Sequence, residues 1–229
     1  MLAKVPDGVS MKEAAVVGLA GNTAYHGLVD NLKFGPNCGK KLLVLGGSTA
    51  TGMFALQIAR HFNCPAIACT STSEELCKSL GATKVIDYRK EDWSEVLRGE
   101  EYDAVFDAMG GYQSYVDSAK VLKKSGTFYS IVGDHPDGTL SFGKMVGVAG
   151  AIAFRGRFLG PYYKIAISLP STPDHGLRFF LGLMAEGKAK AVLDPAEPFE
   201  FSQAGAVAMF NKQASGRCKG KLLMCVRAE

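Results

Sequence analysis

The chain has 229 residues, of which 47% are hydrophobic and 21% are charged, and its formal net charge is +4. This composition excludes a disordered chain and is sufficient for one large α/β domain with a substantial core. The 26 basic and 22 acidic residues form no run of five or six like charges, so the sequence predicts neither a nucleic-acid surface nor a membrane surface.

Two helices and a turn are expected at the start of the chain. Ser10 precedes a helix that continues to about residue 17, Thr23 begins a second helix to about residue 32, and a turn follows at 35–37. From residue 42 onward, strands and helices alternate. We expect strands at 42–46, 66–70, 84–87, 103–107 and 127–132, with helices at 52–62, 73–80, 92–98 and 112–123 between them.

This alternation predicts an α/β fold with a doubly wound parallel sheet and helices on both faces. The apolar runs LLVL, AIAC and AVF are typical of strands that are buried on both sides. After residue 132 the alternation loosens. The segment 142–168 is rich in β-forming residues, helices are expected at 173–186 and 202–213, and a last strand at 221–226.

A glycine-containing turn joins the first predicted strand to its helix. Gly46 and Gly52 permit a tight bend, and the free N–H groups at the start of a helix favour a phosphate. Thr49 occupies the middle position, where a phosphate-binding turn normally has glycine. The turn therefore predicts a nucleotide cofactor, and a plain strand-to-helix turn is the alternative.

The loop after the second strand indicates which nucleotide is bound. An acidic residue at this point normally holds a ribose with free hydroxyls and excludes a 2′-phosphate. Here the loop reads Thr70-Ser71-Thr72-Ser73, with no carboxylate before Glu74, so NADP(H) is favoured over NAD(H). Ser71 and Thr72 could also cap the following helix. The missing acidic residue also counts against an S-adenosylmethionine methyltransferase.

Six cysteines give no sign of a metal site or a redox dithiol. No C-x-x-C pair is present and no histidine lies nearby at metal-ligand spacing; the cysteines are at 38, 64, 69, 77, 218 and 225. We expect no metal, and we expect reduced thiols of an intracellular protein. The mixed charged and apolar N-terminal residues predict neither a signal peptide nor a membrane span.

A series of motifs resembles the medium-chain dehydrogenase/reductases. The motifs are AAVVGLAGNTAYHGL, VLGGSTATGMFALQIAR, LGATKVIDY, VFDAMGG, GTFYSIVG and GKLLMCV, in that order along the chain. The resemblance is strongest to the zinc-independent quinone oxidoreductase branch, which includes mitochondrial reticulon-interacting oxidoreductases. It implies a Rossmann-type domain over 1–229 and either the cytoplasm or an organelle such as the mitochondrion.

The resemblance also implies cofactor-binding roles for individual residues. The pyrophosphate turn corresponds to Gly46, Ser48, Thr49, Ala50, Thr51 and Gly52. Residues around the 2′-phosphate correspond to Thr70, Ser71 and Tyr88, and Tyr88 would donate its hydroxyl. Residues near the ribose and nicotinamide correspond to Thr23, Ala108 and Val132, and the terminal basic segment to Lys219 and Lys221.

Some of these positions have simpler interpretations or depart from the family pattern. Tyr88 could be a half-buried aromatic residue, and Lys219 and Lys221 could be solvated charges beside the last strand. Thr49 and Ala50 stand where the branch generally has glycines, and Ala108 stands where a polar residue is common.

The family carries a β-rich catalytic domain before its cofactor domain. Residues 1–35 resemble the helical lead-in that would join such a domain. The resemblance implies hydride transfer from NADPH to quinones or activated enones, with a noncatalytic NADPH-binding or sensing module as the alternative. No catalytic residue is assigned, although Tyr25 and His135 are candidate proton donors. A homodimer through the sheet edge is also expected.

Overall fold

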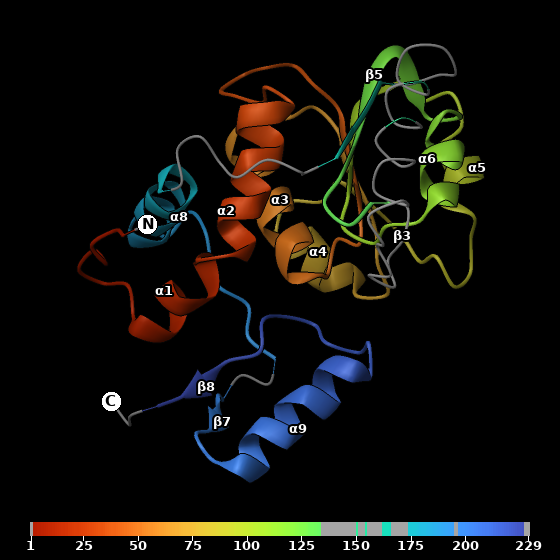
Figure 1. Ribbon diagram of the computed structural model, residues 1–229. Coiled ribbons are helices and arrows are strands. Elements are labelled where there is room, and N and C mark those ends of the chain that lie inside the picture. The colour runs from red at the N-terminus through yellow and green to blue at the C-terminus, as the bar shows by residue number, and fades with distance from the viewer. Residues whose placement is uncertain are drawn as a thin grey trace.

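Six parallel strands form the central sheet of the computed structural model, which describes residues 2–133, 150, 154, 162–165, 174–194 and 197–226 (Figure 1). Their order is β3-β2-β1-β4-β5-β6, and every neighbouring pair is parallel. The strands are β1 (Leu42–Leu45), β2 (Ile67–Thr70), β3 (Lys84–Ile86), β4 (Tyr102–Asp107), β5 (Leu122–Ser130) and β6 (Tyr162–Ile165). From β1 the chain adds strands β2 and β3 on one side of the sheet and then crosses over to add β4, β5 and β6 on the other side. The predicted doubly wound sheet is therefore confirmed.

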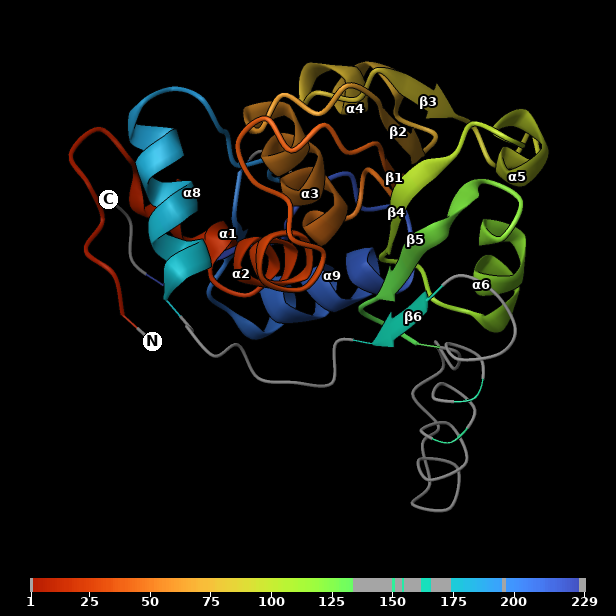
Figure 2. The ribbon, with the colours of Figure 1, turned by 90° about the horizontal axis from the view of Figure 1, so that it is seen from above.

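Helices cover both faces of the sheet. Figure 2 shows α2, α3 and α8 on one side and α5 and α6 on the other. The helices are α1 (Met11–Val17), α2 (Ala20–Tyr25), α3 (Ala50–His61), α4 (Glu74–Ser79), α5 (Trp93–Val96), α6 (Tyr112–Ser118), α8 (His175–Ala185), α9 (Gln203–Ala214) and the π-helix η1 (His26–Asn31). No helix among the described residues is both long and apolar enough to cross a bilayer.

The strand β1 contributes side chains to two hydrophobic cores, one on each face of the sheet. Leu42 and Val44 join the core on the α3 side, whereas Leu43 and Leu45 join the core on the other side. All four side chains are buried. Because successive strand residues point to opposite faces, a strand between two helical layers must be apolar at every position, which explains the LLVL run.

The helical lead-in packs into the larger core. The helix α1 begins with a capping box in which Ser10 accepts from the Glu13 N–H at 3.2 Å and the Glu13 carboxylate accepts from the Ser10 N–H at 3.0 Å. Val17 and Leu28, from α1 and η1, are fully buried in that core. The expected second helix over 23–32 is thus observed as two elements, α2 and η1.

The predicted helix 112–123 was too long at its C-terminal end. The helix α6 ends at Ser118, and β5 begins at Leu122, which pairs with Tyr102. The register with β4 then shifts, so that Ala104 pairs with Thr127 and residues 123–126 have no pairing partner in β4. The Lys123 ammonium lies 2.6 Å from the Asp103 carboxylate within this irregular stretch. This long-range pairing overrides the local helical pattern.

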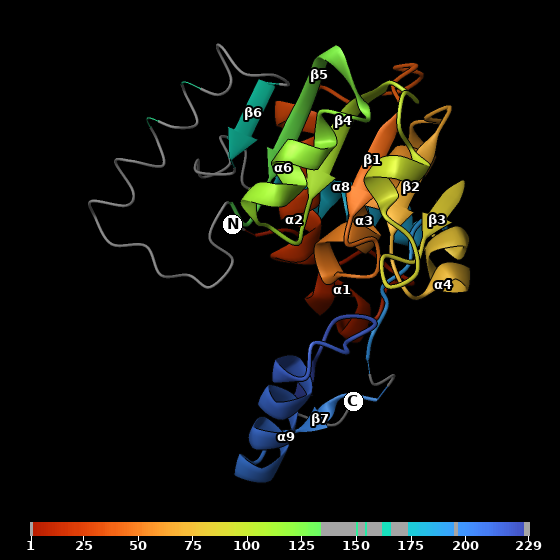
Figure 3. The same ribbon diagram turned by 90° about the vertical axis from the view of Figure 1, so that its right-hand side faces the viewer.

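The end of the chain forms a separate small unit. Its strands β7 (Phe199–Glu200) and β8 (Met224–Cys225) pair in parallel, and Figure 3 shows β7 and α9 below the main sheet. The predicted last strand, 221–226, is therefore present, but it is confined to Met224–Cys225. No residue of α9 is buried, and Phe201 and Phe210 are among the exposed large apolar side chains.

A glycine in η1 allows the lead-in to approach the sheet closely. A Cβ atom on Gly27 would lie 2.5 Å from Phe106 Cε2 and 2.9 Å from Tyr129 Cε1. The two rings stack with their centroids 5.9 Å apart, and both side chains are buried. They therefore have little room to move away from an added methyl group.

We predict that Gly27→Ala lowers the free energy of unfolding by about 1–3 kcal/mol, because the added methyl group overpacks this contact. Gly182→Ala in α8 is the matched control, since no atom lies within 4 Å of the position of its Cβ. The control should be neutral or stabilising by up to about 1 kcal/mol. Equilibrium urea unfolding measures both, and equal stability of the two variants would contradict the close packing.

Candidate nucleotide-binding site

The turn after β1 is fixed by hydrogen bonds to the end of β2. The Gly46 N–H donates to Thr70 Oγ1 at 2.9 Å, and the Gly47 N–H donates to the Thr70 carbonyl at 2.9 Å. Gly46 has a positive φ of 86°, and a Cβ on Gly52 would collide with the Gly46 carbonyl oxygen. Both positions therefore require glycine.

Thr49 has a structural function that explains why it replaces a glycine. It is the N-cap of α3, where its hydroxyl accepts from the Gly52 N–H at 3.0 Å and donates to the Gly46 carbonyl at 2.8 Å. The N–H groups of Ala50 and Thr51, in the first turn of this 12-residue helix, have no acceptor among the described residues. The turn thus retains the free donors and the helix dipole that attract an anion.

Behind the turn lies a pair of buried thiols. A Cβ on Gly47 would lie 2.7 Å from Cys69 Sγ and 3.3 Å from Cys77 Sγ, so the absence of a side chain lets β2 and α4 pack against the turn. A hydrogen bond with Cys69, and a weaker contribution from Ser71, lowers the pKa of the Cys77 thiol. No two of the six cysteines form a disulfide bond.

The hydroxyls of Thr70 and Ser71 serve the fold itself. Thr70 is 5% exposed and accepts from Gly46, while Ser71 is 2% exposed and its Oγ accepts from the Ser73 N–H at 3.0 Å. Neither residue lines the adjacent hollow, which has a volume of about 440 Å³. We call it the adenosine hollow, and its lining residues are Ser48, Thr72, Ser73, Tyr88, Arg89, Gly216, Arg217, Cys218 and Lys219.

The adenosine hollow is positively charged. Arg89, Arg217 and Lys219 line it, and none of its lining residues is acidic. The Arg89 guanidinium lies 5.9 Å from the centre of the Tyr88 ring. The Ser73 hydroxyl is buried and has no hydrogen-bond partner among the described residues. Three cations and an unpaired hydroxyl are a suitable set of groups for a phosphate monoester such as the 2′-phosphate of NADP(H).

Sequence reasoning missed Arg89 and Arg217 as lining residues. Arg89 directly follows Tyr88, and Arg217 lies two positions before Lys219, so both belong to segments that were already of interest. The structure brings these segments together although 128 positions separate the two arginines. Lys221 is not among the lining residues; its N–H donates to the Val192 carbonyl in a short parallel bridge.

A buried carboxylate joins the next two loops at this sheet edge. Asp107, at the end of β4, accepts from the N–H groups of Met109 and Gly110, both at 3.0 Å, and from the Ser130 hydroxyl at 2.7 Å. Ser130 Oγ in turn accepts from the Gly133 N–H at 2.8 Å. Asp107 is fully buried, and its bonds hold the loop after β4 against the loop after β5.

Ala108 and Val132, which the resemblance places near the ribose and nicotinamide, lie in these two loops. Val132 is 41% exposed, and its Cγ1 would be 2.7 Å from a Cβ on Gly110, which has a φ of 79°. The close approach of the two loops therefore depends on glycine at position 110.

The chain matches a known protein family over more than half of its length. A family model described as zinc-binding dehydrogenase matches residues 80–224, which is more than half of the chain. The chain belongs to the zinc-binding dehydrogenase family. The resemblance to medium-chain dehydrogenase/reductases is thereby confirmed.

Individual members of the zinc-binding dehydrogenase family align with almost the whole chain. A zinc-type alcohol dehydrogenase-like protein of Schizosaccharomyces pombe is 37% identical over 226 residues, which cover 96% of this chain and 61% of the relative. An NADPH-dependent alkenal/one oxidoreductase of Arabidopsis thaliana is 32% identical over 206 residues, covering 89% of this chain and 45% of the relative. The chain thus spans about half to three fifths of these curated relatives.

A solved structure shares the fold of this chain. The quinone oxidoreductase from Coxiella burnetii superposes with a TM-score of 0.75 at 23% identity, over 98% of this chain and 64% of that one. Although the family is named for zinc, the described residues of this member contain no group of three or more His, Cys, Asp or Glu side chains placed to hold a metal ion.

The remaining candidates lie outside the adenosine hollow. The Thr23 hydroxyl donates to the Leu19 carbonyl within α2 at 2.8 Å. The Tyr25 ring packs against Phe179 with centroids 5.2 Å apart, and burial, followed by the charge of Asp30, raises the pKa of its hydroxyl. Tyr25 is therefore a weaker acid than an ordinary tyrosine. His135 lies outside the described residues.

We predict that Thr49→Ala lowers the free energy of unfolding by about 1 kcal/mol, since the helix loses its N-cap. Thr49→Ser keeps the hydroxyl and should remain within about 0.5 kcal/mol of the wild type. Urea unfolding followed by circular dichroism measures both changes. If the serine variant is as unstable as the alanine variant, the hydroxyl is not the group that matters.

Proposed function

We propose that this member of the zinc-binding dehydrogenase family is an NADPH-dependent oxidoreductase, which transfers hydride to quinones or activated enones. The observation that carries the proposal is the adenosine hollow, which adjoins the phosphate-binding turn and has three cationic side chains and no acidic one. An NAD(H)-specific site would have a carboxylate at this point to bind the ribose hydroxyls.

The residues of the turn would bind the pyrophosphate. The free N–H groups of Ala50 and Thr51 point out of the first turn of α3, and Ser48 lies between this turn and the adenosine hollow. Backbone N–H donors and the helix dipole can bind the doubly charged pyrophosphate without any charged side chain. Thr49 supports this arrangement by keeping the helix start in place.

The residues of the adenosine hollow would bind the 2′-phosphate. Arg217, Arg89 and Lys219 supply charge, while Ser73 and Tyr88 supply hydroxyl donors. Arginine can donate two parallel hydrogen bonds to one phosphate, so we assign the largest share of the selectivity to the two arginines. Thr70 and Ser71 would act indirectly, by holding the end of β2.

The loops fixed by Asp107 would contact the ribose and nicotinamide, with Ala108 and Val132 as the nearest candidates. Bound NADPH would supply the hydride, and the protein would supply position and a water-poor environment. Rigid loops suit this task because hydride transfer requires the nicotinamide to be held close to the acceptor.

The substrate class rests on the relatives. The Arabidopsis relative is named for alkenals and enones, and the Coxiella neighbour is named a quinone oxidoreductase. Both substrate types present an electron-poor double bond or carbonyl to a hydride donor. Zinc-independent chemistry is part of this proposal. The homodimer, for which β6 provides the edge strand, stays a prediction.

We predict that the chain binds NADPH at least about tenfold more tightly than NADH, because a 2′-phosphate adds charge-assisted hydrogen bonds. Arg217→Ala should weaken NADPH binding about tenfold and leave NADH binding unchanged, and Tyr88→Phe should have a smaller effect in the same direction. Isothermal titration calorimetry measures both ligands. The control is Lys124→Ala, an exposed cation of β5 outside the hollow. Equal affinity for both cofactors would contradict the proposal.

We predict that NADPH is oxidised in the presence of quinones or enones, whereas saturated ketones leave it unchanged. The decrease in absorbance of NADPH measures the rate across such a panel. Tight NADPH binding without turnover by any acceptor would instead favour the noncatalytic binding or sensing module.

A further inference from the structure

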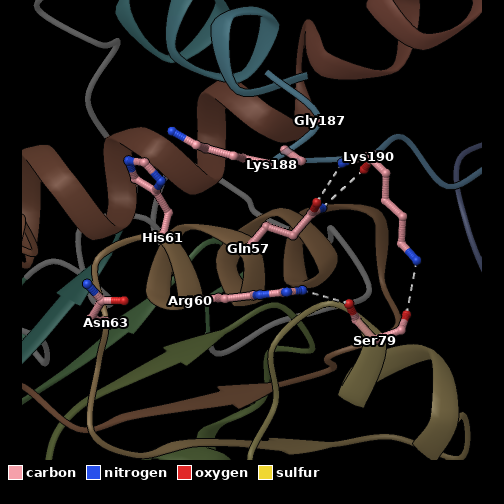
Figure 4. Close-up of a pocket in the computed structure, with 9 residues that line it drawn as sticks. Gln57, Arg60, His61, Asn63, Ser79, Gly187, Lys188 and Lys190 are labelled. Carbon is pink, nitrogen blue, oxygen red and sulfur yellow. Dashed lines mark hydrogen bonds between the residues drawn. The ribbon is translucent and has the colours of Figure 1, made fainter. Parts of the chain in front are cut away.

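A second hollow lies on the protein at the opposite end of α3. It has a volume of about 460 Å³ and lies where α3, α4 and the segment after α8 meet (Figure 4). We call it the basic hollow, and its lining residues are Gln57, Arg60, His61, Asn63, Ser79, Gly187, Lys188, Ala189 and Lys190. None of these residues is acidic, and the volume is within the range of small-molecule sites.

Two cations converge on one residue of the basic hollow. The Arg60 guanidinium donates to the Ser79 carbonyl at 3.1 Å, and the Lys190 ammonium donates to Ser79 Oγ at 3.1 Å. Both partners are uncharged, and neither cation has a carboxylate partner among the described residues. Figure 4 shows the two side chains approaching Ser79 from different sides.

The other end of the basic hollow carries Lys188 and His61, which Figure 4 shows on the side away from Ser79. Lys188 has one acidic partner, because its ammonium lies 2.7 Å from Glu186. The amide side chain of Gln57 lies between the two ends, and that of Asn63 lies on the His61 side (Figure 4). The hollow therefore has two cations without an acidic partner at the Ser79 end, and one ion-paired lysine with an imidazole at the other end.

The supporting structure is more ordered than an ordinary cluster of surface lysines. Gln57 is 5% exposed, and its amide accepts from the Lys190 N–H at 2.8 Å and donates to the Lys190 carbonyl at 3.2 Å. The Arg60 stem packs on Gly81, where a Cβ would lie 2.5 Å from Arg60 Cβ. The backbone of Lys190 is thus attached to α3, on which Arg60 also lies, and both exposed side chains extend to Ser79.

Helix dipoles account for part of this charge. The helices α3, α4 and α8 all end nearby, and a helix C-terminus favours one cation. However, the three ends together carry only about one and a half negative elementary charges, whereas two full positive charges meet at Ser79 alone. Solvent screens these exposed cations, and because neither has an acidic partner, both remain available to an anionic ligand.

We propose that the basic hollow binds a small organic polyanion, with one oxyanion group between Arg60, Ser79 and Lys190 and a second near Lys188 and His61. A phosphate ester and a polycarboxylate share this chemistry, since both offer oxygen acceptors to a guanidinium and an ammonium. The cations gather in one concave site instead of along a stripe, which fits a metabolite better than a nucleic acid or a membrane.

The test is a titration of the ¹⁵N-labelled full chain with inorganic pyrophosphate and, separately, with citrate, followed by two-dimensional NMR. We expect saturable shifts of the Ser79, Gly187, Ala189 and Lys190 amides with at least one of the two probes. Binding by pyrophosphate alone would assign the site to phosphate esters, and binding by citrate alone to polycarboxylates. Either result supports the proposal.

The matched variants separate this site from general charge effects. The double variant Arg60→Gln/Lys190→Gln should weaken binding about tenfold or more, because two charge-assisted donors are lost. The double variant Lys4→Gln/Lys124→Gln removes the same charge from two exposed positions elsewhere and should bind within about twofold of the wild type. Thermal unfolding of all variants establishes that they are folded.

Three results would overturn the proposal. The first is a lack of saturable shifts at the basic hollow with either probe. The second is a shift confined to residues 46–52 and 216–219, which would assign the probe to the adenosine hollow. The third is an equal loss of probe affinity in both double variants, which would show that the net charge of the protein, and not the basic hollow, determines binding.

Discussion

The hydrogen bonds that hold the turn after β1 against the end of β2 are the constraint on which the rest of the site depends. Thr70 accepts from Gly46 through its hydroxyl and from Gly47 through its carbonyl, while Thr49 spans the turn from Gly46 to Gly52. These bonds orient the first turn of α3, and the free donors of that turn exist only in this orientation. The same bonds fix the end of β2, from which the adenosine hollow begins.

The rest of this sheet edge is organised by a second set of bonds. Asp107 and Ser130 tie together the loops after β4 and β5 without using a side chain that faces outward. Burying a carboxylate is energetically unfavourable unless its oxygens accept hydrogen bonds. The three donors from Met109, Gly110 and Ser130 offset this penalty, and they fix the two loops in doing so. The exposed residues of these loops can vary while their backbone stays in place.

The sequence was sufficient to predict most of the fold because β1 is apolar at every position, β2 and β4 each have a continuous apolar run at their centre, and glycines or caps separate the strands from the helices. It placed the turn of Gly46 and Gly52 correctly, but the capping bond of Thr49 depends on its ψ of 157°, which spacing alone does not reveal. The end of α6 was misjudged because pairing of Leu122 with Tyr102 is a long-range contact. Arg217 was missed for a similar reason: its neighbours in the hollow are distant in sequence.

The helix α3 begins at one hollow and ends at the other. Its 12 residues, at a rise of about 1.5 Å each, give it a length of about 18 Å. The shorter helix α4 joins the same two hollows, because Ser73 lines the adenosine hollow and Ser79 lines the basic hollow. A ligand in one of the two proposed sites would therefore meet two helices that end at the other site, and α3 and α4 are the direct routes by which its binding could be felt there.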